Sequence, residues 1–262
     1  MALPKIEVPT YELTLPSVDQ QVKYRPFLVK EEKLLMMALE TGEDEAMKNA
    51  TIDLVNACTM GKLKAEDLPI FDIEYLFLNI RAKSVGEVGK FQVICPEDKI
   101  TLIPVEIDLT TVEVQVDDKH TNNVVLDESR KLGIVMKYPT LKLVPMGIDK
   151  EMNADKIFDL MVSCIDHIYE GDKIYPAKDS TKAELVEFFN NLNTDQFALI
   201  RKFFDEMPRL RHTLKVVNPK TKKESEVTFT GLQDFFVSAS PTNPYRPITK
   251  LILHLFNIIN IR

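Results

Sequence analysis

The stretch from Tyr24 to Gly42 changes from extended chain to amphipathic helix within a few residues, and this change strongly constrains the fold. Proline fixes its own φ at about −65° and disfavours helical geometry at the residue before it, so Pro26 ends the extended segment. Good helix formers follow, and a glycine suited to ending a helix comes next. We therefore expect a helix over 29–41 that packs one apolar face on a core. This apolar face is a stripe of four residues, Leu34, Leu35, Met37 and Ala38.

Composition and charge indicate a soluble globular protein whose partners are not polyanions. The chain has 262 residues, of which 45% are hydrophobic and 28% charged, enough for one large domain or two ordinary ones. Its 33 basic and 40 acidic side chains give a net charge of −7, so neither nucleic acid nor a membrane is an expected partner. No stretch is apolar enough to span a bilayer or to serve as a signal peptide. Three widely spaced cysteines indicate a reducing compartment, so we expect a cytoplasmic protein.

Helical and β periodicities alternate along the rest of the chain. A hairpin is expected over 6–27, and the segment 69–84 is apolar nearly all round, which predicts the most buried helix of the first half. The Ser/Thr-x-x-Glu spacing at 180–184 predicts a capping box. Further helices are expected over 46–60, 151–170, 181–192 and 195–207, the last capped by Thr194. Further strands are expected within 88–117 and 122–145 and over 212–218 and 224–230.

Both halves of the chain contain helices followed by a strand-turn-strand unit. Asp53–Cys58 parallels Asp159–Cys164, and Cys95-Pro96 parallels Asn218-Pro219. The pattern predicts an α+β fold of two modules, related either by duplication or by chance similarity. Each strand-turn-strand unit resembles a zinc ribbon without its cysteines. The expected partition is an N-terminal α+β module over 1–118, a β-rich connection over 119–150, a second α+β module over 151–238 and an atypical C-terminal tail over 239–262.

The sequence contains no pattern typical of a catalytic, cofactor or metal site. Neither a nucleophile motif, nor a zinc-protease motif, nor a glycine-rich phosphate loop is present. A structural zinc site needs four nitrogen or sulfur ligands, and the two turns retain a single cysteine, Cys95. We interpret all three cysteines as core thiols and expect no cofactor. The alternative is a small cytoplasmic enzyme of unknown class, and its best candidate cluster is Cys164, Asp166 and His167.

Four blocks of sequence resemble a known family. They are PTYEL at Pro9–Leu13, KYRPFLVKEEK at Lys23–Lys33, DLPIFDIEYLFLNIR at Asp67–Arg81 and TGLQDFF at Thr230–Phe236. The chain resembles the T4-type phage baseplate hub family, which comprises the hub subunit and hub assembly proteins of contractile-tailed phages. The resemblance extends over residues 5–238. It implies a non-enzymatic protein that assembles the central hub through protein–protein contacts, either as a hub subunit or as an assembly factor or chaperone.

The resemblance also implies partners, a location and a set of residues. The partners would be other baseplate hub or tail proteins, and the chain could form an oligomer. The expected location is the cytoplasm of an infected bacterial host, as for a late virion-assembly protein, or the tail baseplate of the virion. The candidate interaction or structural residues are Tyr24, Arg25, Pro26, Phe27, Phe71, Tyr75, Phe77, Phe235 and Phe236.

The C-terminal tail departs from the family pattern. The family continues past the last block with a helical tail that contains tyrosine and histidine, whereas 248–262 is rich in isoleucine and leucine. One codon choice for these residues, shifted by two bases, encodes a peptide similar to the expected tail. Two interpretations therefore stay open for 240–262: an out-of-frame ending, or an apolar helix that docks on a partner.

Overall fold

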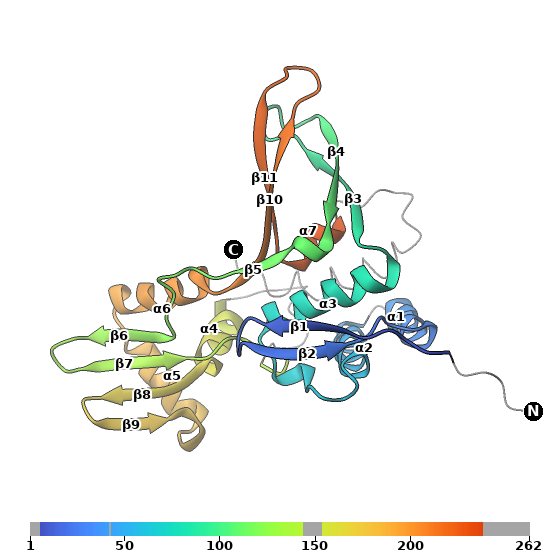
Figure 1. Ribbon diagram of the computed structural model, residues 1–262. Coiled ribbons are helices and arrows are strands. Elements are labelled where there is room, and N and C mark those ends of the chain that lie inside the picture. The colour runs from blue at the N-terminus through green and yellow to red at the C-terminus, as the bar shows by residue number, and fades with distance from the viewer. Residues whose placement is uncertain (1–5, 42, 144–153, 238–262) are drawn as a thin grey trace, which may run out of the picture. The chain divides into compact units, whose positions relative to one another are not determined.

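A computed structural model describes residues 6–41, 43–143 and 154–237 (Figure 1). The expectations for the C-terminal tail lie outside these residues. The described chain is a mixture of helices and small antiparallel sheets, which confirms the α+β class. It divides into two compact units, Met1–Gln115 with Arg209–Arg262 and Val116–Pro208.

The first unit begins with the expected hairpin, β1 (Tyr11–Leu15) and β2 (Gln20–Tyr24), followed by three helices. The helices are α1 (Val29–Thr41), α2 (Asp44–Cys58) and α3 (Ile70–Val85), close to their expected bounds. The hairpin turn is tied to α3, because the Ser17 backbone N–H lies 3.3 Å from Asp72 Oδ1 and the Ser17 hydroxyl donates to Asp72 Oδ2. The hairpin is therefore fixed by the chain that follows it.

Helix α3 is the core of the first unit, as its apolar sequence predicts. Large side chains on every side of it are fully buried, namely Ile73, Leu76, Phe77, Leu78 and Ile80. Burying such side chains stabilises a fold by about 1.5–3 kcal/mol each, measured against leaving them exposed. The other elements of the unit pack around this helix.

Two long hairpins and a short helix complete the first unit (Figure 1). The hairpins are β3 (Val88–Ile94) with β4 (Leu102–Asp108), and β10 (Arg209–Val217) with β11 (Glu224–Thr230). Helix α7 (Gly231–Val237) follows β11 directly. The ring centroid of Phe91 lies 5.5 Å from that of Phe229 and 6.3 Å from that of Phe235. This aromatic cluster joins β3, β11 and α7.

The grouping of the chain differs from the sequence-based partition into 1–118, 119–150 and 151–238. Strand β10 pairs antiparallel with β5 (Glu113–Gln115), with Leu210 opposite Val114. Because of this pairing, the second strand-turn-strand unit packs with the first one and not with the helices that precede it in sequence. A duplication of the two halves stays a prediction.

The second unit contains a four-stranded antiparallel sheet in the order β6-β7-β8-β9. Its strands are β6 (Asn123–Asp127), β7 (Leu132–Met136), β8 (Ile165–Glu170) and β9 (Lys173–Pro176). Its helices are α4 (Ala154–Ser163), α5 (Lys182–Asn190) and α6 (Thr194–Glu206). Phe158, Phe189 and Phe197 pack together, with ring centroids 5.2–5.8 Å apart, and join these three helices.

Two expectations for the second unit are wrong. A helix was expected over 151–170, but α4 ends at Ser163 and β8 begins at Ile165. The isoleucines of β8 suit a strand, and pairing with β7 places Ile168 opposite Ile134. The cap of α6 is Asn193 instead of Thr194, because Asn193 Oδ1 accepts the Gln196 N–H at 2.9 Å. The capping box of Thr181 and Glu184 is confirmed.

Candidate interaction surface

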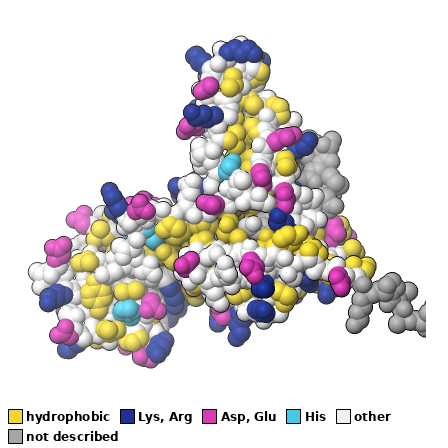
Figure 2. All heavy atoms as spheres, viewed as in Figure 1, with side chains coloured by type: hydrophobic (Ala, Val, Ile, Leu, Met, Phe, Trp, Pro, Cys, Tyr) yellow, Lys and Arg dark blue, Asp and Glu magenta, His cyan; other side chains and the backbone are white. Residues whose placement is uncertain are grey.

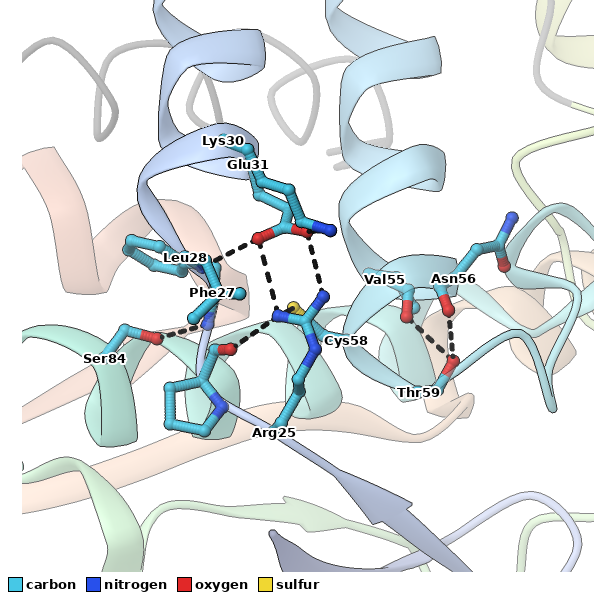
Figure 3. Close-up of polar contacts among 11 residues, drawn as sticks. Arg25, Phe27, Leu28, Lys30, Glu31, Val55, Asn56, Cys58, Thr59 and Ser84 are labelled. Atoms are coloured by element: carbon cyan, nitrogen blue, oxygen red, sulfur yellow. Dashed lines mark hydrogen bonds and ion pairs between the residues drawn. The ribbon is translucent and has the colours of Figure 1, made fainter. Parts of the chain in front are cut away.

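Arg25 and Glu31 form an ion pair at the beginning of α1 (Figure 3). Arg25 Nη2 donates to Glu31 Oε1 at 2.9 Å, and Nη1 lies 3.4 Å from Oε2. Nη1 also donates to the Pro26 carbonyl at 2.9 Å. The side chains are 13% and 3% exposed, so this is a largely desolvated pair with two-point geometry. It fixes the direction in which α1 leaves the extended segment.

The same segment connects α1 to the next two helices. The Arg25 backbone N–H donates to the Cys58 carbonyl at the end of α2, 2.9 Å away. The Phe27 backbone N–H donates to Ser84 Oγ on α3, also at 2.9 Å. These bonds satisfy donors that the extended chain would otherwise leave unpaired, so the segment holds the ends of three helices together.

The electrostatics of the pair favour its ionised form. Burial opposes a charge on Glu31, but the hydrogen bonds from Arg25 and from the Leu28 backbone N–H outweigh it and hold the pKa of Glu31 below its ordinary value. The Leu28 N–H lies 2.7 Å from Glu31 Oε2. A carboxylate near the first turn also interacts favourably with the helix dipole. Glu31 thus serves both as a partner of Arg25 and as a local cap.

Beyond this anchor, α1 and α2 form an open apolar groove. Leu34 and Met37 of α1 line it, and their side chains are 48% and 53% exposed. Ala38 and Ala50 form its buried floor, and their small side chains leave the groove hollow. Carboxylates on both helices, those of Glu40 and Asp53, also line it. An exposed apolar surface edged by charge is typical of a protein interaction site.

The groove corrects the expectation for α1. The whole stripe was expected to pack on the core, but only Leu35 and Ala38 are buried, whereas Leu34 and Met37 face the groove. The sequence reads Leu-Leu-Met-Met at 34–37, so the apolar residues cover more of the helix than one core face requires. This excess of apolar residues is the sequence feature that could have indicated an exposed apolar surface. Glu31 was interpreted only as a helix former, because nothing in sequence pairs it with Arg25.

Most of the candidate residues from the family blocks are buried or half-buried. Tyr24, Phe71, Phe77 and Phe235 are at most 4% exposed, and Arg25, Pro26, Phe27 and Tyr75 are half-buried. The side chain of Phe236 lies outside the described part of the chain. Leu232 of the last block donates its backbone N–H to Glu74 of α3 at 3.2 Å. Two of the blocks therefore meet each other in the core.

The structure does not assemble the candidate enzyme cluster. Cys164 is fully buried, and burial raises the pKa of its thiol to about 12, which leaves it unreactive as a nucleophile. His167 Nδ1 lies 2.8 Å from Asp166 Oδ2, but both residues belong to a strand and not to the expected helix. In the ranges that the structure describes, no three His, Cys, Asp or Glu side chains are placed to hold a metal ion. Within those same ranges, no helix is long and apolar enough to cross a membrane.

The exposed apolar groove is typical of a surface that contacts another protein. Comparison with protein families identifies which class of assembly is involved. The model of the T4 bacteriophage base plate protein family matches residues 8–237, and the chain belongs to this family. No curated protein and no solved structure matched the chain. Family membership points to a structural or assembly role in the tail baseplate, in contact with other baseplate proteins.

Proposed function

We propose that the protein assembles the central hub of a T4-like phage baseplate without enzymatic activity, as a hub subunit or as an assembly factor that acts like a chaperone. Its partners would be other hub or tail proteins, and it would meet them in the cytoplasm of the infected host. The observation that carries this proposal is the apolar groove of α1 and α2 on a member of a baseplate family. Burial raises the pKa of the Cys58 and Cys164 thiols to about 12, which argues against either cysteine acting as a nucleophile.

The chemistry of the groove specifies its partner. Leu34 offers a branched and Met37 an unbranched apolar side chain, and such side chains adapt to an apolar helix face. The carboxylates of Glu40 and Asp53 favour basic residues beside that face. We therefore expect the groove to accept an amphipathic helix of another hub protein with lysine or arginine at its flanks.

Co-purification from infected cells tests this function. The tagged chain should bring down hub proteins, and Met37→Glu should weaken the complex by about tenfold or more, because it places a charge in the apolar contact. Ile174→Glu is the matched control, since Ile174 is a 64% exposed apolar residue of β9 in the other unit. Because both sites are exposed, both variants should fold. Recovery of no baseplate protein by the unaltered chain would overturn the proposed function, whereas equal binding by both variants would move the contact away from the groove.

A further inference from the structure

The turns of the two long hairpins share one backbone geometry. Each begins with a residue followed by proline, Cys95 in the first turn and Asn218 in the second. The carbonyls of these residues accept the N–H of the residue four positions later, Lys99 or Lys222, at 2.9 Å in both turns. Lys99 and Lys222 have positive φ values of 55° and 62°. The β1–β2 turn at Leu15-Pro16 has the same backbone bond and a positive φ at Asp19, so the chain uses this hairpin turn repeatedly, and the feature that sets the two long hairpins apart is the contact between their turns.

The two turns also contact each other through their side chains. Asn218 Nδ2 lies 3.4 Å from Cys95 Sγ and 3.1 Å from Asp98 Oδ2, across more than a hundred residues of sequence. Asn218 and Cys95 are fully buried. Thr221 of the second turn donates its hydroxyl to Glu97 of the first, and Lys223 Nζ lies 3.2 Å from the same carboxylate.

Each turn thus presents two side chains three positions apart, Cys95 with Asp98 and Asn218 with Thr221. Pairs of ligands at this spacing, one pair on each of two turns, are how a zinc ribbon holds its metal. In a tetrahedral site with Zn–S bonds of about 2.3 Å, the sulfur atoms lie about 3.8 Å apart. The spacing of Asn218 Nδ2 from Cys95 Sγ and Asp98 Oδ2 is on this scale.

We infer that the two turns form the framework of a four-ligand structural zinc site in which hydrogen bonds hold the turns together in place of a metal. The Asn218 amide donates toward both members of the first turn, which is the linking role that a central cation would otherwise have. The Asp98 carboxylate also stabilises its own turn, because it accepts hydrogen bonds from the backbone N–H groups of Ile100 and Thr101 and from the Thr101 hydroxyl. The two turns are therefore joined although only one of the four positions, that of Cys95, carries a thiol.

The surroundings of the tip would favour thiolates if they were restored. Figure 2 shows basic side chains at the tip of the β10–β11 hairpin, and the lysines of the two turns, Lys99, Lys220 and Lys222, are exposed. Nearby positive charge lowers the pKa of a thiol and stabilises the anionic ligand. The framework thus predicts that three substitutions to cysteine, beside the native Cys95, are sufficient to create a zinc site.

The test uses the full chain carrying D98C, N218C and T221C together. The control carries D98C, K220C and K222C, which gives it the same number of cysteines but leaves the second pair of positions, Asn218 and Thr221, unchanged. Metal content, Co²⁺ absorption and thermal unfolding with and without Zn²⁺ are measured under reducing conditions. We expect one metal ion per chain in the first variant, bound at least about 100-fold more tightly than in the control, with thiolate-to-cobalt absorption and a Zn²⁺-dependent rise in Tm.

The outcomes separate the proposal from a folding defect. If the first variant is unfolded without metal, Zn²⁺ should restore its circular dichroism spectrum, because metal binding then drives folding. A folded first variant that binds Zn²⁺ no better than the control would overturn the inference. So would an unfolded first variant that Zn²⁺ does not restore.

Discussion

The guanidinium of Arg25 lies against the carboxylate of Glu31, six residues away, with Nη2 and Oε1 2.9 Å apart. The pair stands where the extended chain becomes α1, and the backbone of the same segment is bonded to Cys58 and Ser84. The pair therefore fixes where α1, the helix that lines the groove, leaves the extended segment before it.

Arg25→Ala should be strongly destabilising. Removing one partner of a buried ion pair leaves the other charge uncompensated, and we expect a loss of about 2–4 kcal/mol in the free energy of unfolding. Lys23→Ala is the control, because Lys23 pairs with Glu12 at 3.1 Å on the exposed surface and should cost about 0.5 kcal/mol or less. Urea denaturation measures the free energy of unfolding of both variants. Equal effects would show that the buried pair has no special role.

Glu74 should make the stability of the first unit depend on pH. Burial raises the pKa of this carboxyl to about 7, against the opposing hydrogen bond from the Leu232 N–H. An acid with a raised native pKa binds more protons folded than unfolded, so its contribution falls as pH rises from its ordinary value of 4.5 to about 7.

Glu74→Gln should remove that dependence while keeping an oxygen acceptor for Leu232. Relative to the native chain, we expect the variant to gain about 1–3 kcal/mol between about pH 5 and pH 8. Denaturation curves at several pH values measure the difference. A stability difference that stays constant across this range would contradict the assignment.

His120 should give the second unit the opposite dependence. Its ring stacks on Tyr138 and Phe203, with centroids 5.7 and 5.1 Å away, and among the described residues neither ring nitrogen has a hydrogen-bond partner. Burial lowers the pKa of His120 below its ordinary value of 6.5, although Glu206 and Asp117 oppose this. A base with a lowered native pKa loses its stabilising contribution as pH falls below that ordinary value.

His120→Phe should flatten this acid-side loss, because phenylalanine can stack in the same place and does not titrate. The difference in Tm between the variant and the native chain should grow from about pH 8 to pH 5. His167→Gln is the control, since His167 contacts Asp166 outside this stack. Equal acid sensitivity of the His120 variant and the native chain would refute the prediction.

Thr181→Ala should shorten or fray α5. Thr181 accepts the Glu184 N–H at 3.3 Å, and its own N–H donates to Glu184 Oε2 at 2.7 Å. Loss of the hydroxyl should cost about 1 kcal/mol. The neighbouring Ser180→Ala is the control, because the Ser180 hydroxyl donates to the Pro176 carbonyl at 3.4 Å and not to α5. Hydrogen exchange in the first turn of α5 should rise only in the Thr181 variant, and unchanged exchange would count against the capping box.

Much of the fold was predictable where local chemistry decides it. The break at Pro26 predicts that α1 begins just after it, the all-round apolarity of 69–84 predicts a core helix, and the 180–184 spacing predicts the cap of α5. In each case the signal lies within one turn or one element. These are the features that single-sequence patterns represent well.

The failures have a common physical cause, which is dependence on distant partners. The apolar residues of 157–168 fit a helical period throughout, but pairing with β7 makes the second part a strand. The stripe of α1 could not be divided between core and groove without knowing where α2 lies. Arg25 and Glu31 are too far apart in sequence for a helical pair, and the contact of Asn218 with Cys95 joins residues 123 positions apart.

Quantitative mass spectrometry of isolated baseplate-assembly intermediates, beside purified mature particles, would test whether this protein belongs to the hub. We expect it in hub-containing intermediates at a fixed ratio to other hub proteins. Its presence in mature particles at the same ratio would identify a hub subunit, and its presence only in intermediates would identify an assembly factor. Absence from both would contradict the assignment to the hub.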